Sequence, residues 1–134
     1  MIERKIDIFL KEWKEDVNKK PLIVKGARQI GKTFSIMQFA TSSYKYVVNI
    51  NFALQEKFKT IFNDGFDVDA IINNITLLDP NIKIEAGNTL IFFDELQACS
   101  NCATSLKPFA IDGRYDIICS GSLMGINYHE IESN

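Results

Sequence analysis

A glycine-containing segment, Gly26-Ala27-Arg28-Gln29-Ile30-Gly31-Lys32-Thr33, carries the residue types that hold phosphate. It matches the pattern G-x-x-x-x-G-K-[ST] at every fixed position. Gly26 permits a turn that is closed to residues with a Cβ, and Gly31 lets the backbone approach a phosphate closely. The backbone N–H groups of such a loop form a nest for an anion, and the following helix adds the positive end of its dipole.

Two side chains complete this P-loop pattern. Lys32 places a compact positive charge between the β- and γ-phosphates. Thr33 offers a hydroxyl to Mg²⁺, which prefers hard oxygen ligands and usually keeps several waters. We therefore predict that the chain binds ATP with Mg²⁺. The expected nucleotide contacts come from Gly26, Ala27, Arg28, Gln29, Ile30, Gly31, Lys32, Thr33 and Phe34.

A pair of carboxylates, Asp94 and Glu95, follows the apolar stretch 90–93. Asp94 is placed to hold the metal through water, so Thr33 and Asp94 are the predicted metal residues. Glu95 is placed to orient and deprotonate an attacking water as a general base. The alternative is an acidic loop start in which both groups are solvated. A glutamate directly after the aspartate favours hydrolysis over transfer to a small acceptor.

A third group of polar residues, Ser120-Gly121-Ser122, ends a later apolar stretch. If that stretch is a strand between the first and third strands, its carboxyl end faces the γ-phosphate. Ser122 is then favoured over Ser120 as a hydroxyl that hydrogen-bonds the phosphate or the water. Ordinary turn chemistry is the alternative. Gln97 is a further side chain within reach of this site.

A cysteine pair and one arginine could also take part in chemistry, but for both we favour a structural role. Cys99 and Cys102 have CxxC spacing, but a structural zinc site needs four ligands and the chain has one histidine, His129. We interpret them as loop cysteines, with metal or redox chemistry as the alternative. No arginine finger can be assigned: Arg114 is the one candidate donor, and a surface role is the favoured reading.

The elements that position these residues alternate along the chain between helical and strand patterns. Apolar residues recur at helical spacing over 2–17, and Asp67 resembles the N-cap of a later helix. We expect helices over 2–17, 32–40, 54–62, 68–75 and 104–109, strands over 22–24, 46–51, 90–93 and 115–120, and a loop over 80–88. This alternation predicts a parallel sheet with helices on both faces.

Length and composition limit the remaining possibilities. The 134 residues suit one domain. The formal net charge of −2 gives no global basic field that would attract nucleic acid or an anionic membrane. No apolar run approaches the ~20 residues of a membrane span, and the N-terminus has no secretory pattern. Three cysteines do not suggest a disulfide framework, so we expect a cytoplasmic protein.

Taken together, the segments 26–33, 89–97 and 120–125 resemble those of the AAA-superfamily ATPases of bacteria and archaea whose C-terminal region is uncharacterised. The likeness covers nearly the whole chain. It implies a three-layer P-loop NTPase fold with strand order 5-1-4-3-2, in a longer protein. The fifth core strand, a helical lid and a C-terminal domain have no counterpart here. We therefore expect a truncated single core, with a leading amphipathic helix over 1–18 and a nucleotide-binding core over 21–134.

The function expected from these features is Mg-dependent ATP hydrolysis coupled to movement of a missing C-terminal domain. The alternative is a non-hydrolysing nucleotide-binding fragment that acts in assembly. We expect weak turnover, and self-association through an open edge of the first strand. A GTPase is disfavoured because no Asn-Lys-x-Asp motif occurs. A small-molecule kinase is disfavoured because no candidate lid arginine follows Arg114.

Overall fold

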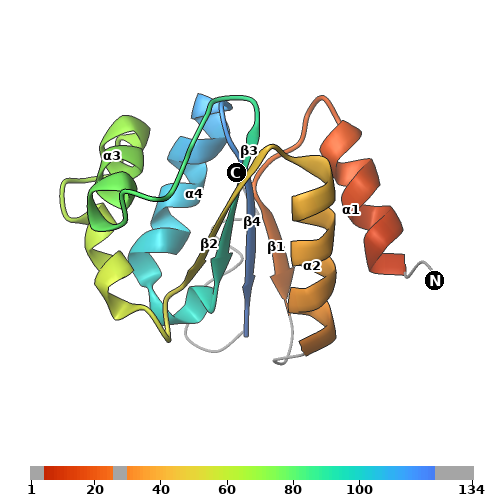
Figure 1. The fold of residues 1–134 in the computed structure, drawn as a ribbon, viewed down its shortest axis with the longest axis horizontal. Coiled ribbons are helices and arrows are strands. Elements are labelled where there is room, and N and C mark those ends of the chain that lie inside the picture. The colour runs from red at the N-terminus through yellow and green to blue at the C-terminus, as the bar shows by residue number, and fades with distance from the viewer. Residues whose placement is uncertain (1–4, 26–29, 123–134) are drawn as a thin grey trace.

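The computed structural model describes residues 5–25 and 30–122 as three layers, a sheet between two layers of helices (Figure 1). The strands are β1 (Leu22–Lys25), β2 (Tyr46–Asn51), β3 (Thr89–Asp94) and β4 (Asp116–Gly121). The helices are α1 (Lys5–Glu15), α2 (Ile30–Ser43), α3 (Val68–Leu78) and α4 (Ser100–Asp112), with 3₁₀ helices η1 (Glu56–Phe62) and η2 (Leu96–Ala98). The α/β alternation read from the sequence is confirmed.

The four described strands form one sheet in the order β1-β4-β3-β2, and every pairing is parallel. This order confirms the 1-4-3-2 part of the expected arrangement. Because the strands are parallel, they all end at one side of the sheet, which is the lower side in Figure 1. We call this side the carboxyl edge; its strands end at Lys25, Asn51, Asp94 and Gly121.

One face of the sheet is covered by α1 and α2, which lie to the right in Figure 1. Leu10 of α1 and Ile36 of α2 are fully buried against Phe92 of β3 and Ile118 of β4 in one apolar cluster. Burial of apolar side chains of this size stabilises the fold by about 1.5–3 kcal/mol each. The packing holds α2, and with it Lys32, in a fixed place beside β1.

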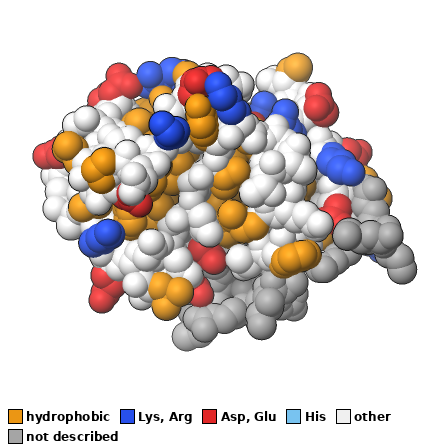
Figure 2. Space-filling model, viewed as in Figure 1, with side chains coloured by type: hydrophobic (Ala, Val, Ile, Leu, Met, Phe, Trp, Pro, Cys, Tyr) orange, Lys and Arg blue, Asp and Glu red, His pale blue; other side chains and the backbone are white. Residues whose placement is uncertain are grey.

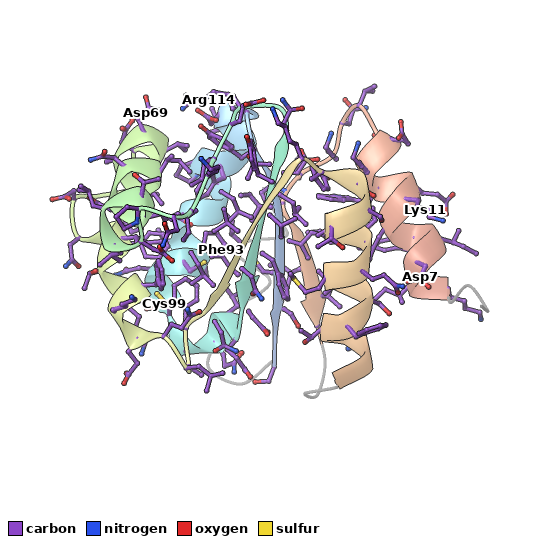
Figure 3. The ribbon with its side chains drawn as sticks, viewed as in Figure 1. Asp7, Lys11, Asp69, Phe93, Cys99 and Arg114 are labelled. Atoms are coloured by element: carbon purple, nitrogen blue, oxygen red, sulfur yellow. The ribbon has the colours of Figure 1, made fainter. Side chains whose placement is uncertain are left out.

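The opposite face is covered by η1, α3 and α4 (Figure 1). Phe93 of β3 points into this layer in Figure 3 and is fully buried. Its ring lies 5.5 Å from that of Phe52, 6.2 Å from that of Phe109 and 6.5 Å from that of Phe62, measured between centroids. Such aromatic contacts add to the burial itself. They fix β3 one residue before Asp94.

Local sequence signals account for several element boundaries. The side chain of Asp67 accepts a hydrogen bond from the backbone N–H of Ala70 at 3.1 Å, so the predicted N-cap of α3 is confirmed. Helix α4 ends at Gly113, whose φ of 75° is the left-handed conformation in which a glycine commonly ends a helix.

Some sequence expectations need correction. Phe9, expected on the buried stripe of the first helix, is 52% exposed, because α1 packs its other flank, at Leu10, against α2. Val17 is 94% exposed because α1 ends at Glu15, before reaching it. Leu54 is also exposed, because it lies in the turn before η1. The helix expected over 104–109 begins earlier, at Ser100.

The surface and the helices are consistent with the composition. Acidic and basic side chains are interspersed on the face shown in Figure 2, as a net charge of −2 suggests. Among the described residues, no helix is long and apolar enough to cross a membrane.

Candidate nucleotide site at the carboxyl edge

Lys32 and Thr33 lie in the first turn of α2, next to the carboxyl edge (Figure 1). The ammonium Nζ of Lys32 donates a hydrogen bond to the carbonyl oxygen of Lys25, the last residue of β1, at 2.7 Å. Thr33 is half-buried and Phe34 is largely exposed. Of the other predicted nucleotide contacts, Gly26, Ala27, Arg28 and Gln29 lie outside the described residues, and Ile30 and Gly31 begin α2.

Asp94 is the last residue of β3 and lies at the centre of the same edge. In the strand register it is opposite Asn51 of β2 on one side and Ser120 of β4 on the other. Its Oδ1 accepts the backbone N–H of Glu95 at 2.9 Å. The carboxylate is half-buried between two neighbouring strands, which is where a residue that serves a metal through water would have to lie.

Glu95 has an unusual backbone conformation. Its φ of 56° and ψ of 52° are left-handed, and it is the one non-glycine residue with positive φ in the described part of the chain. A left-handed residue with a Cβ costs on the order of 1–2 kcal/mol, and such residues cluster at functional sites. The conformation turns the chain sharply from β3 into η2. It keeps the Glu95 side chain beside the edge.

The side-chain amide of Gln97 connects Glu95 to β4. Its Nε2 donates to Glu95 Oε1 at 2.6 Å, and its Oε1 accepts the backbone N–H of Ser122 at 3.0 Å. The first contact is a short hydrogen bond. Sequence inspection placed Gln97 within reach of the site but did not show that it joins the two predicted catalytic residues, Glu95 and Ser122.

Gly121 makes this connection sterically possible. A Cβ at this position would lie 2.5 Å from Gln97 Oε1 and 3.0 Å from the backbone nitrogen of Leu96. Atoms do not approach a Cβ this closely without displacement, so a side chain here would push the Gln97 amide away. Gly121 also pairs with Lys25 of β1. The carbonyl oxygen of Lys25 accepts the hydrogen bond from the Lys32 ammonium.

The strand order therefore brings most of the predicted site residues to one edge. Lys32 lies beside the end of β1, Ser122 follows β4, and Asp94 and Glu95 end β3, on three neighbouring strands. The arrangement presents a cation, a hydroxyl residue and two carboxylates in that order. The cation at one end can bind a phosphate. The carboxylates at the other end can bind a water or a metal ion.

Arg114 lies at the opposite edge of the sheet. It precedes β4, and Figure 3 shows it with Asp69 at the upper side of the molecule, away from the carboxyl edge. Its Nη2 lies 2.7 Å from Asp69 Oδ1 and 2.7 Å from Asp112 Oδ1. The hydrogen bond from Arg114 lowers the pKa of the Asp112 carboxyl. Arg114 is therefore ion-paired at the surface and lies away from the carboxyl edge of its own chain.

The sequence predicted loop positions for both Cys99 and Cys102. Cys99 does lie in the connection between η2 and α4, but Cys102 lies in the first turn of α4. Both are buried in the apolar cluster on the face of the sheet that η1, α3 and α4 cover. Burial raises the pKa of each thiol, and the neighbouring thiol of Cys119 raises that of Cys102 further. Within residues 5–25 and 30–122, no cluster of three or more His, Cys, Asp or Glu could hold a metal ion.

Comparison with known protein families adds an independent observation. The sequence model of the family described as "AAA domain" matches residues 18–134. The match includes all four strands and every residue of the carboxyl edge discussed above, and it begins after α1. No curated protein is similar enough to match.

Proposed function

The chain belongs to the AAA domain family of P-loop ATPases, whose members bind ATP, and we propose that it hydrolyses ATP in a Mg²⁺-dependent reaction. The observation that carries this proposal is the position of Glu95. It follows Asp94 at the carboxyl edge, and a neutral amide bonds it to the backbone of Ser122. A carboxylate at this position suits a group that orients and deprotonates a water.

Each side chain has a distinct part in the proposed reaction. Lys32 binds the β- and γ-phosphates with an ammonium that has three donors, so it can keep its bond to Lys25 and still donate to a phosphate. Glu95 orients the attacking water and accepts its proton. The hydroxyl of Ser122 donates to the γ-phosphate or to that water.

The residues present suit Mg²⁺ better than a metal ion whose ligands all come from the protein. Mg²⁺ binds through one or two protein oxygens plus phosphate oxygens and water. Thr33 and Asp94 would supply those oxygens, and no larger cluster of ligands occurs among the described residues. When bound, the ion neutralises charge on the phosphate oxygens. Asp94 would act from the centre of the edge, with its Oδ1 oriented by the Glu95 N–H.

We propose that hydrolysis is coupled to a change of shape in a further C-terminal domain.

We also propose self-association through β1. Among the described strands, β1 pairs with β4 alone, so its other side presents the backbone groups of Leu22–Val24. An edge of this kind is a template for pairing with another strand. Light scattering of the purified chain at increasing concentration tests this part of the proposal.

The test of hydrolysis compares phosphate release with nucleotide binding on the same samples. We expect wild type to release phosphate from ATP with Mg²⁺ and to stop when the ion is chelated. Lys32→Ala should bind more weakly, whereas Glu95→Gln should bind as wild type does and hydrolyse much more slowly. Binding without phosphate release by wild type would favour the alternative, a nucleotide-binding module that acts in assembly.

A further inference from the structure

Gln97 is held by two groups of opposite hydrogen-bonding character. The carboxylate of Glu95 can only accept, and the backbone N–H of Ser122 can only donate. Gln97 meets both, with Nε2 at 2.6 Å from Glu95 Oε1 and Oε1 at 3.0 Å from Ser122 N. These two partners fix which end of the amide is which, because the reversed orientation would place oxygen against oxygen and N–H against N–H.

Among side chains, few could make this connection. It requires a donor and an acceptor on one planar group, at the reach of a side chain from η2 to β4. A glutamate at position 97 would keep an acceptor for Ser122 but would set a second carboxylate against Glu95. An alanine would lose both contacts. The link therefore depends on the amide chemistry of Gln97 and not on its bulk.

The segment to which Gln97 is bonded is itself held in place. Gly121 pairs with Lys25 of β1, and the carbonyl of Lys25 accepts the Lys32 ammonium. The close approach of Gln97 Oε1 to Gly121 leaves no room for a Cβ between them. A displacement of the backbone at Gly121 and Ser122 must therefore displace the amide, and with it the group that orients Glu95.

We propose that Gln97 is a positioning residue that couples the orientation of the Glu95 carboxylate to the position of the backbone at Gly121 and Ser122. The role in turnover rests on the proposed function, because it requires Glu95 to act on the attacking water. A phosphate contact that moves Ser122 would then change how Glu95 is held. Gln97 itself touches no reacting atom in this scheme.

The coupling can be tested without turnover, by hydrogen exchange of the Ser122 amide followed by NMR. In Gln97→Ala the amide loses its acceptor, so its exchange should become about fivefold faster, the ratio implied by the usual net contribution of one hydrogen bond. Gln97→Glu keeps an acceptor and should retain slow exchange. Glu95→Ala should also accelerate exchange at Ser122, because Gln97 loses its second anchor. Unchanged Ser122 exchange in Gln97→Ala or in Glu95→Ala would overturn the coupling.

The effect on catalysis is tested by the separate changes in kcat and KM of hydrolysis. Gln97→Ala should lower kcat about tenfold with KM changed less than twofold. Gln55→Ala is the matched control, because the side chain of Gln55 also accepts a hydrogen bond from a backbone N–H at this edge, that of Asn51 at 3.0 Å.

The outcomes separate the two proposals. A kcat of Gln97→Ala equal to that of wild type, or an equal loss of kcat in Gln55→Ala, contradicts a positioning role for Gln97. A wild-type chain that releases no phosphate contradicts the proposed hydrolysis instead. In that case the Ser122 exchange rates still decide whether Gln97 couples Glu95 to β4.

Discussion

The ammonium of Lys32 and the carbonyl oxygen of Lys25 are joined by a 2.7 Å hydrogen bond between the first turn of α2 and the end of β1. The bond holds the positive charge of Lys32 at the carboxyl edge. Through the pairing of Lys25 with Gly121, the same edge continues to β4 and from there to Gln97 and Glu95. The cation and the carboxylate of the proposed site are thus parts of one hydrogen-bonded structure.

Replacing Lys32 by alanine should weaken Mg-ATP binding by at least about tenfold. A hydrogen bond from a charged group contributes about 1.5–3 kcal/mol, and a factor of ten corresponds to about 1.4 kcal/mol. Isothermal titration calorimetry measures the effect. Lys45→Ala is the control, since Lys45 is paired with Glu85 at 3.7 Å at the other end of the sheet. Equal affinities of wild type and Lys32→Ala would remove Lys32 from the nucleotide site.

Replacing Gly121 by alanine should destabilise the fold by about 1–3 kcal/mol, the usual cost of adding a methyl group where there is no space. The new Cβ would meet Gln97 Oε1 at 2.5 Å. In a Gln97→Ala background that contact is gone, so the cost measured by urea unfolding should be smaller. Additive effects of the two substitutions would show that Gly121 and Gln97 do not constrain each other.

Replacing Phe93 by alanine should lower the free energy of unfolding by about 3–5 kcal/mol, because a fully buried ring in contact with three other rings is removed. Phe9→Ala is the matched control. Its ring is 52% exposed, so its loss should cost less than about 1 kcal/mol. Urea denaturation of both variants measures the difference, and similar costs would mean that α1 buries Phe9 after all.

The fold was largely predictable because the apolar spacing of each element is strong. Residues 90–93 and 117–119 are continuous apolar runs, which is typical of strands covered on both faces, and both are central strands. The extent of burial on α1 was not predictable. Phe9 and Leu10 are equally apolar and flank the same stripe, and only the position of α2 decides that Leu10 is buried.

The site was predictable in residue type but not in its internal connections. The Asp94-Glu95 pair and Lys32 were identified from their spacing and from the strands that precede them. The left-handed conformation of Glu95 carries no sequence signal, because glycine or asparagine would normally mark it. Since that conformation and η2 determine where Gln97 points, the Gln97 link to Ser122 could not be read from the sequence. Cys102 was placed in a loop instead of in α4 because residues 99–103 have little helical periodicity.

The burial of Cys102 predicts a pH dependence of stability. Its pKa is raised in the folded state above the ordinary value of 9.0 by burial and then by Cys119, so the folded chain keeps a proton that the unfolded chain releases. The stabilisation is fully present below about pH 9 and is lost as pH rises further, with a slope of up to about 1.4 kcal/mol per pH unit for one proton. Cys102→Ala should flatten this slope between pH 9 and 10. An unchanged slope would assign the dependence to other groups.

The most direct test of the central claim is a phosphate-release assay on wild type, Glu95→Gln and the control Glu56→Gln, with Mg-ATP affinity measured on the same preparations. Glu56 is an exposed carboxylate that pairs with Lys59 at 3.3 Å and should be dispensable. We predict that Glu95→Gln binds Mg-ATP as wild type does and hydrolyses it about 10²-fold or more slowly, the scale of a lost general base. Phosphate release by Glu95→Gln at the wild-type rate would contradict the account.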